Sequence, residues 1–83
     1  MLIYISHPYG GKEENKTKVE NIIKKLIKEN PEHTYISPIH TFGHLYNDVD
    51  YETGLQWCLD LLNECDKMYV YGGWENSRRK AYE

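Results

Sequence analysis

Residues 1–11, which read MLIYISHPYGG, decide the fold class of this 83-residue chain. The apolar run Leu2–Ser6 ends at a turn that contains a proline and two glycines, which predicts a buried strand followed by a tight loop. From Glu13 to Glu29 the apolar residues recur at helical spacing, with acidic residues in the first turn and lysines near the end. Asn30-Pro31 ends this predicted helix. The opening third of the chain therefore predicts a strand, a Gly-rich loop and an amphipathic helix.

The same alternation continues along the rest of the chain. Thr34–Ser37 and Lys67–Tyr71 are short β-rich runs that predict a second and a third strand. A second helix is predicted over about Asp50–Glu64, and Pro38–Asp48, which carries a glycine and several polar residues, is predicted to be irregular. Asn76 or Ser77 would cap a last helix of one or two turns.

The order strand-helix-strand-helix-strand-helix predicts an α/β fold. Such alternation implies a parallel sheet with right-handed crossovers and helices on its faces. We therefore expect a single Rossmann-like, three-layer domain over residues 1–83, with a small parallel sheet and a truncated last helix.

Charge and composition exclude several classes of protein. The net charge is −3, with ten basic against thirteen acidic residues, which argues against a binder of nucleic-acid backbone. The N-terminus lacks the basic region of a signal peptide, and no apolar run approaches the roughly 20 residues of a membrane span. Cys58 and Cys65 are predicted to belong to one helix, roughly 10 Å apart, too far for a disulfide. Reduced cysteines predict a cytoplasmic protein.

The chain is rich in aromatic residues, with eight tyrosines and two tryptophans. Such side chains cover apolar surface while they present a polar tip, which suits a pocket or an oligomer interface. Since the core of so short a chain is small, we expect a homo-oligomer.

Three predicted loops converge at the carboxyl ends of the strands, where open α/β sheets bind ligands. They are His7–Glu13, Pro38–Asp48 and Gly72–Ser77, the segments richest in glycine, histidine, tyrosine and tryptophan. Gly10-Gly11 is either a plain turn or a cradle for a phosphate, because glycines let the backbone approach an anion. The Ser77 hydroxyl is either a helix cap or part of the same anion site.

Two clusters of side chains allow more than one interpretation. His40 and His44 have the spacing of metal ligands on a helix face, but Pro38 and Gly43 argue against a helix, and no metal or other cofactor is predicted. One of these histidines would instead contact a ligand or the facing loop. The basic residues 78–80 are either a solvated face or a phosphate clamp.

Several motifs together resemble the nucleoside 2-deoxyribosyltransferase superfamily, particularly its small DUF4406-like branch. Tyr4–Gly11 is similar to the family's opening, Tyr-Ile-Ala-Gly-Pro-x-x-Gly, and Ser37-Pro38 is similar to an Asn-Pro after the second strand. Cys65-Asp66 followed by Gly73–Ser77 resembles a Cys-Asp…Gly-Trp-x-x-Ser segment. The resemblance implies a Rossmann-like domain that acts on the N-glycosidic bond of a nucleoside or nucleotide.

The resemblance also implies roles for particular residues. Glu83 would be the nucleophile at C1′ of the sugar, where a carboxylate can trap the oxocarbenium-like centre. Ser77 and the Gly10-Gly11 turn would hold phosphate or sugar. The residues that would wall the base are Tyr4, His7, Tyr9 and Trp74.

The chain departs from the family pattern at three positions and at its end. Cys58 stands where the family has an aspartate, and Asp60 lies about 200° further around the helix. His7 and Arg79 stand where the family has glycines. The last helix would end at Glu83 and leave apolar sheet surface exposed, so we expect either a subunit partner on that face or a truncated form.

Three hypotheses for function follow. The first is an N-glycoside hydrolase or deoxyribosyltransferase, and the second is a nucleotide-binding module of the same fold without catalysis. The third is a structural protein that oligomerises through its aromatic surface. The substitution Glu83→Gln separates the first two, because it abolishes turnover in an enzyme and barely alters affinity in a binding module.

Overall fold

The computed structural model describes residues 1–72, and within them strands and helices alternate as the sequence predicts. The strands are β1 (Leu2–Ser6), β2 (Thr34–Ile36) and β3 (Lys67–Val70). The helices are α1 (Glu13–Glu29), α2 (Pro38–Phe42) and α3 (Tyr51–Asn63), with a short 3-10 helix, η1 (Gly43–Leu45), after α2. The predicted last helix lies outside the described residues, together with Trp74, Ser77 and Glu83.

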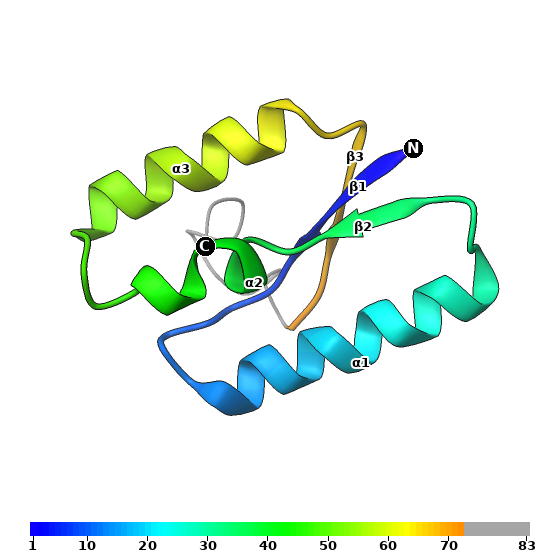
Figure 1. The fold of residues 1–83 in the computed structure, drawn as a ribbon, viewed down its shortest axis with the longest axis horizontal. Coiled ribbons are helices and arrows are strands. Elements are labelled where there is room, and N and C mark those ends of the chain that lie inside the picture. The colour runs from blue at the N-terminus through cyan, green and yellow to red at the C-terminus, as the bar shows by residue number, and fades with distance from the viewer. Residues whose placement is uncertain (73–83) are drawn as a thin grey trace.

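Within residues 1–72 the strands form a parallel sheet in the order β2-β1-β3. The first crossover leads from β1 to β2, and the second leads back past β1 to β3. Because right-handed crossovers in opposite directions place their helices on opposite faces, α1 and α3 lie on the two sides of the sheet (Figure 1). This arrangement confirms the α/β, Rossmann-like fold class.

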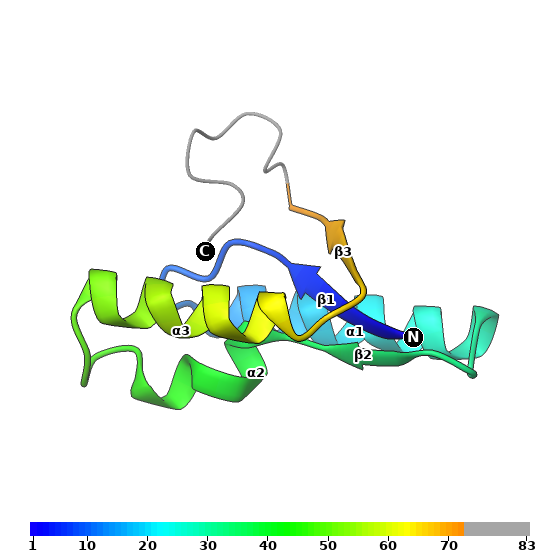
Figure 2. The same cartoon turned by 90° about the horizontal axis from the view of Figure 1, so that it is seen from above.

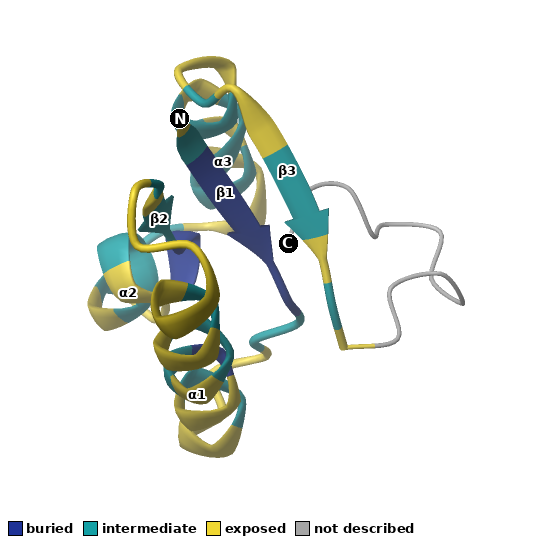
Figure 3. Ribbon diagram, turned by 90° about the vertical axis from the view of Figure 1, so that its right-hand side faces the viewer, coloured by how far each residue is buried: buried dark blue, intermediate teal, exposed yellow. Residues whose placement is uncertain are grey.

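The core is built around the central strand, which Figure 3 shows as the buried element between its two neighbours. Ile3 and Ile5 are at most 1% exposed and pack with Val19 of α1 and Ile39 of α2. Tyr4 is as deeply buried, but alternation along a strand points its side chain to the opposite face, toward α3. The two layers of helix therefore meet different side chains of the same strand.

The stretch Pro38–Asp48 was predicted to be irregular, which is wrong, because α2 and η1 occupy most of it. The helix starts at a strong signal: the Ser37 hydroxyl accepts a hydrogen bond from the His40 N–H at 3.4 Å, and Pro38 takes the first helical position. Gly43 does not break the chain, since its φ of −58° is that of a right-handed helix. Figures 1 and 2 show α2 beside α3.

The second predicted helix is one residue shorter at each end, and Cys65 lies beyond it rather than within it. The Asp50 carboxylate caps the N-terminus of α3 by accepting the Thr53 N–H at 2.8 Å. Acidic residues at 64 and 66 oppose a longer helix, because they face the negative end of its dipole. The Cys65 thiol donates to the Leu61 carbonyl at 3.3 Å, and both cysteines are free, as predicted.

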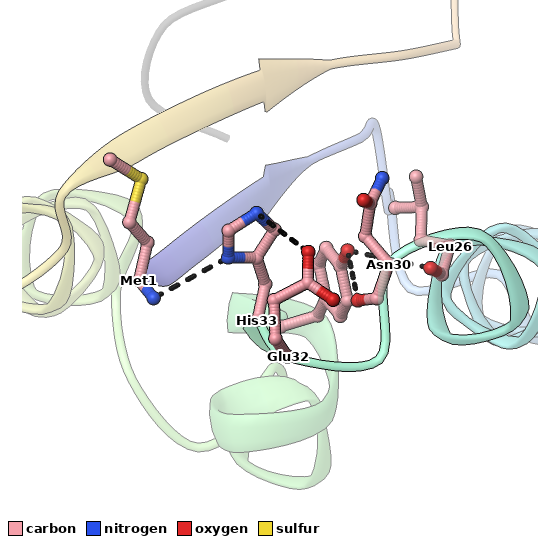
Figure 4. A network of polar contacts seen from close by, with 6 residues as sticks. Met1, Leu26, Asn30, Glu32 and His33 are labelled. Carbon is pink, nitrogen blue, oxygen red and sulfur yellow. Dashed lines mark hydrogen bonds and ion pairs between the residues drawn. The ribbon is translucent and has the colours of Figure 1, made fainter.

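Polar contacts hold the amino-terminal edge of the sheet. The Asp66 carboxylate accepts the Leu2 N–H at 2.8 Å, and the Leu2 carbonyl accepts the Asp66 N–H at 2.7 Å. Figure 4 shows the neighbouring network, in which the Met1 ammonium donates to His33 Nδ1 at 3.4 Å and Glu32 lies 3.9 Å from Nε2. The opposite edge, at the carboxyl ends of the strands, is where open α/β sheets bind ligands. None of the helices within residues 1–72 is long and apolar enough to cross a membrane.

Candidate ligand-binding pocket

A cavity of about 270 Å³ opens beside the carboxyl ends of β1 and β2. The loop after β1 forms one wall, α2 and η1 form a second, and the N-terminal half of α3 forms a third. Small-ligand pockets span about 300–1,000 Å³, so this cavity suits a ligand of one ring system. The residues that line it are Tyr9, Gly10, Pro38, Ile39, Phe42, Gly43, Tyr46, Val49, Asp50, Tyr51, Gly54, Leu55, Trp57 and Cys58.

Aromatic rings dominate the walls of the pocket. Tyr9 and Tyr46 meet edge to face, with ring centroids 5.2 Å apart and planes at 82°. Phe42 and Trp57 form a second, tilted pair with centroids 5.5 Å apart. Tyr46 and Tyr51 are about half exposed, at 49% and 50%, and stand at the rim. Rings in these orientations offer flat apolar faces to a planar ligand.

The Gly10-Gly11 loop is explained by the fold itself. Both glycines have positive φ, of 61° and 74°, which side chains rarely adopt. A Cβ at Gly11 would lie 3.0 Å from the Tyr46 ring, so this glycine lets the aromatic wall close on the loop. The Tyr9 carbonyl ties the loop to α1 by accepting the Lys12 N–H at 3.1 Å and the Asn15 side-chain amide at 2.9 Å. The first turn of α1 beyond it carries two carboxylates, at residues 13 and 14.

Tyr4 lies behind the pocket wall rather than in it. Its hydroxyl donates a hydrogen bond to the thiol of Cys58, which does line the pocket. Burial raises the pKa of Tyr4 far above its usual value, and burial also raises the pKa of the Cys58 thiol, although the bond from Tyr4 opposes that rise. Both groups are therefore neutral at neutral pH. Asp60 points elsewhere, as expected: it is exposed and accepts a hydrogen bond from Gln56 at 2.9 Å.

His7 lies apart from the pocket, between the ends of β1 and β3. It is 4% exposed, and its Nδ1 donates to the Pro8 carbonyl at 2.7 Å. A Cβ at Gly72 would lie 2.6 Å from Pro8 Cδ and 2.9 Å from His7 Nε2, so the backbone after β3 packs directly on this corner. The described parts of the three loops thus converge, but the structure separates His7 from Tyr9.

His40 contacts a helix, α1, rather than the facing loop that the sequence suggested. Its Nε2 donates to the Glu20 carboxylate on α1 at 3.1 Å, and its Nδ1 lies 3.1 Å from the Ser37 hydroxyl. A row of carboxylate, imidazole and hydroxyl resembles a nucleophilic triad, but Ser37 is 3% exposed and caps α2. The row therefore braces a wall of the pocket. Within residues 1–72 no group of three or more His, Cys, Asp or Glu side chains could hold a metal ion.

Comparison with known proteins identifies a family for this chain. A family model described as a domain of unknown function, DUF4406, matches residues 1–83. The chain belongs to the DUF4406 family. Searches of curated proteins and of solved structures gave no match. The description of the family states no activity, so the likeness to nucleoside 2-deoxyribosyltransferases stays a prediction.

The pocket of this DUF4406 domain contains residues that the sequence did not single out as binding residues. Tyr51, Gly54, Leu55 and Cys58 follow one another at the i, i+3, i+4, i+7 spacing of a single helix face. Following this spacing back along the predicted helix from Cys58 to Tyr51 would have found this face. Of the predicted binding residues, Tyr9 and Gly10 line the pocket, while Tyr4 and Gly11 each touch a residue that does.

Proposed function

We propose that this DUF4406 domain binds a nucleoside or nucleotide, with the base in the aromatic pocket. One observation carries the proposal: a cavity of about 270 Å³, walled by two aromatic pairs, opens at the carboxyl ends of β1 and β2. Ligands of open α/β sheets bind at this edge. Stacking of a base on an aromatic side chain contributes about 1–3 kcal/mol, so two such pairs support binding of a base.

Cleavage of the N-glycosidic bond, by hydrolysis or base transfer, is the catalytic form of the proposal. It depends on Glu83 as nucleophile and rests on the resemblance alone. The described part of the pocket favours the binding form, because Cys58, a neutral thiol, stands where the resemblance implies an aspartate. With its pKa raised, this thiol is a weaker proton donor than a carboxyl group for assisting the departure of a nucleobase.

Two variants of Gly54 test whether the pocket holds the ligand. Gly54 lines the cavity in the first turn of α3, and a Cβ added there meets only Val49 Cγ2, at 3.7 Å. Gly54→Leu fills the space, whereas Gly54→Ala adds one methyl group and leaves most of the space. Both replace a helical glycine, so we expect each to stabilise the free protein by up to about 1 kcal/mol and to raise its melting temperature.

The experiment is calorimetric titration with nucleosides, nucleotides and free bases, followed by chromatography of each mixture for released base. We expect binding by the natural protein and by Gly54→Ala, and at least a tenfold loss in Gly54→Leu. If the natural protein releases free base and Glu83→Gln does not, the result supports an enzyme. If the natural protein binds the ligand and returns it intact, the result supports a binding module. Absence of binding by the natural protein to every compound would overturn the proposal.

We also propose, from the composition of the chain, that the protein self-associates and is cytosolic. Val70 at the end of β3 is 45% exposed and Ile27 on α1 is 48% exposed, so both offer apolar surface in the described part of the chain. Light scattering at several protein concentrations measures the assembly directly, and a monomer at all of them would contradict self-association.

A further inference from the structure

One residue gives the pocket its charge. Among the described residues that line the cavity, Asp50 is the one that carries a carboxyl or a basic group. The others are apolar, aromatic or small, apart from the Cys58 thiol. The Lys12 side chain of the neighbouring loop is exposed and does not line the cavity. A ligand in the pocket therefore meets a carboxylate and no cation from these residues.

Hydrogen bonds from Thr53 hold the Asp50 carboxylate in place and leave part of its acceptor capacity free for a ligand. It caps α3, where it accepts both the backbone N–H of Thr53, at 2.8 Å, and the Thr53 hydroxyl. These hydrogen bonds hold the pKa of Asp50 below its usual range, so the group is ionised at neutral pH. A carboxylate accepts about four hydrogen bonds, which leaves capacity for donors from a ligand.

In the described part of the chain, carboxylates from two helices stand on this side of the domain, together with the exposed Lys12. Glu13 and Glu14 stand in the first turn of α1, beyond the Gly10-Gly11 loop, and Glu52 stands beside Asp50 in the first turn of α3. A phosphate brought to this side of the domain would meet carboxylates on both helices. A neutral ligand with an N–H donor meets an acceptor instead.

We propose that Asp50 makes the pocket selective for unphosphorylated nucleosides whose base carries an exocyclic amino group, such as adenosine or cytidine. This inference rests on the proposed function. The amino N–H donates to the carboxylate, while the keto group of inosine or uridine turns an oxygen toward it. Two acceptors that face each other lose the hydrogen bond and repel, so we expect the keto compounds to bind at least tenfold more weakly.

The substitution Asp50→Asn reverses the recognition while it keeps the helix. Asn caps a helix as well as Asp, so α3 begins at the same residue, but the side chain now offers an amide N–H. We expect Asp50→Asn to bind inosine and uridine more tightly than the natural protein does. We also expect the affinity of adenosine 5′-monophosphate to rise relative to that of adenosine, because the repelling charge is gone.

Glu52→Gln is the matched control. It removes the same charge from the same helical turn, at a residue that does not line the pocket. Calorimetry should give the natural ratio of adenosine to inosine affinity in Glu52→Gln and a ratio reduced at least tenfold in Asp50→Asn. A natural protein that binds adenosine and inosine equally, or a ratio unchanged in Asp50→Asn, overturns the inference and leaves the proposed function standing. If no nucleoside binds, both the inference and the proposed function are overturned.

Discussion

The hydroxyl of Tyr4, on the central strand, donates a hydrogen bond to the thiol of Cys58, on the helix that walls the pocket. Tyr4 is 1% exposed, whereas Cys58 lines the cavity. The bond therefore connects the rigid core of the sheet to the surface that a ligand would touch. It also sets the chemistry of that surface, because it opposes the rise that burial causes in the pKa of the thiol.

Removing this hydroxyl makes the Cys58 thiol less reactive. In Tyr4→Phe the ring still fills the core, but the bond that lowers the pKa of Cys58 is lost, so that pKa rises further. Since the thiolate is the reactive form, alkylation by iodoacetamide at pH 8 should slow. A Cys65→Ala background makes Cys58 the reporting thiol. We expect a loss of about 1 kcal/mol of stability from the missing hydrogen bond; an unchanged or faster alkylation rate contradicts the assignment.

The two glycines of the loop after β1 should differ in their tolerance of alanine. Gly10→Ala and Gly11→Ala both force a side chain into positive φ, which costs about 1–2 kcal/mol. A Cβ at Gly10 meets nothing within 4 Å, whereas one at Gly11 lies 3.0 Å from the Tyr46 ring and must displace it. Urea denaturation should therefore show a larger loss of stability for Gly11→Ala. Equal losses would mean that Tyr46 does not pack on the loop as described.

The cap of α2 contributes to the wall of the pocket. Ser37→Ala removes the oxygen that accepts the His40 N–H and lies against the His40 ring. Loss of a helix cap costs about 1 kcal/mol, so the midpoint of urea unfolding should fall. Ser37→Thr retains a hydroxyl and should stay closer to the natural protein. If the two variants unfold at the same midpoint, the Ser37 hydroxyl does not stabilise α2.

The first helix could be predicted from the sequence with its observed bounds because every local signal agrees there. The apolar spacing, the acidic first turn and Asn30-Pro31 all indicate Glu13–Glu29. The short α2 could not, since Gly43 reads as a breaker and conceals the Ser37-Pro38 start signal. Gly43 has a helical φ of −58° and its N–H donates to the Ile39 carbonyl, and the Tyr9 ring lies 3.4 Å from where a Cβ would be. Glycine disfavours a helix but does not forbid one, so propensity alone misassigned this segment.

The pocket lies at the strand ends, where the sequence predicted a site, but most of its wall residues were not predicted. Convergence of loops at the strand ends follows from the topology of parallel sheets, and the order of strands and helices is enough to infer it. The contribution of Tyr51 and Trp57 depends on how α3 crosses the end of the sheet, which no local pattern states. The motif Cys65-Asp66, one basis of the resemblance, has a structural role here, because Asp66 holds the first N–H of β1.

The lowered pKa of Asp50 predicts how the stability of the domain depends on pH. Its folded-state pKa is lowered by the hydrogen bonds from Thr53, so ionised Asp50 stabilises the fold above its unfolded pKa, and this stabilisation is lost as the pH falls through the folded value. The window therefore lies below about pH 4. In Asp50→Asn the cap is kept without the charge that favours a helix N-terminus. We expect the natural protein to melt at a higher temperature than Asp50→Asn at pH 7 and the difference to shrink by pH 3. A difference that stays constant between these pH values would show that the charge of Asp50 does not stabilise the helix.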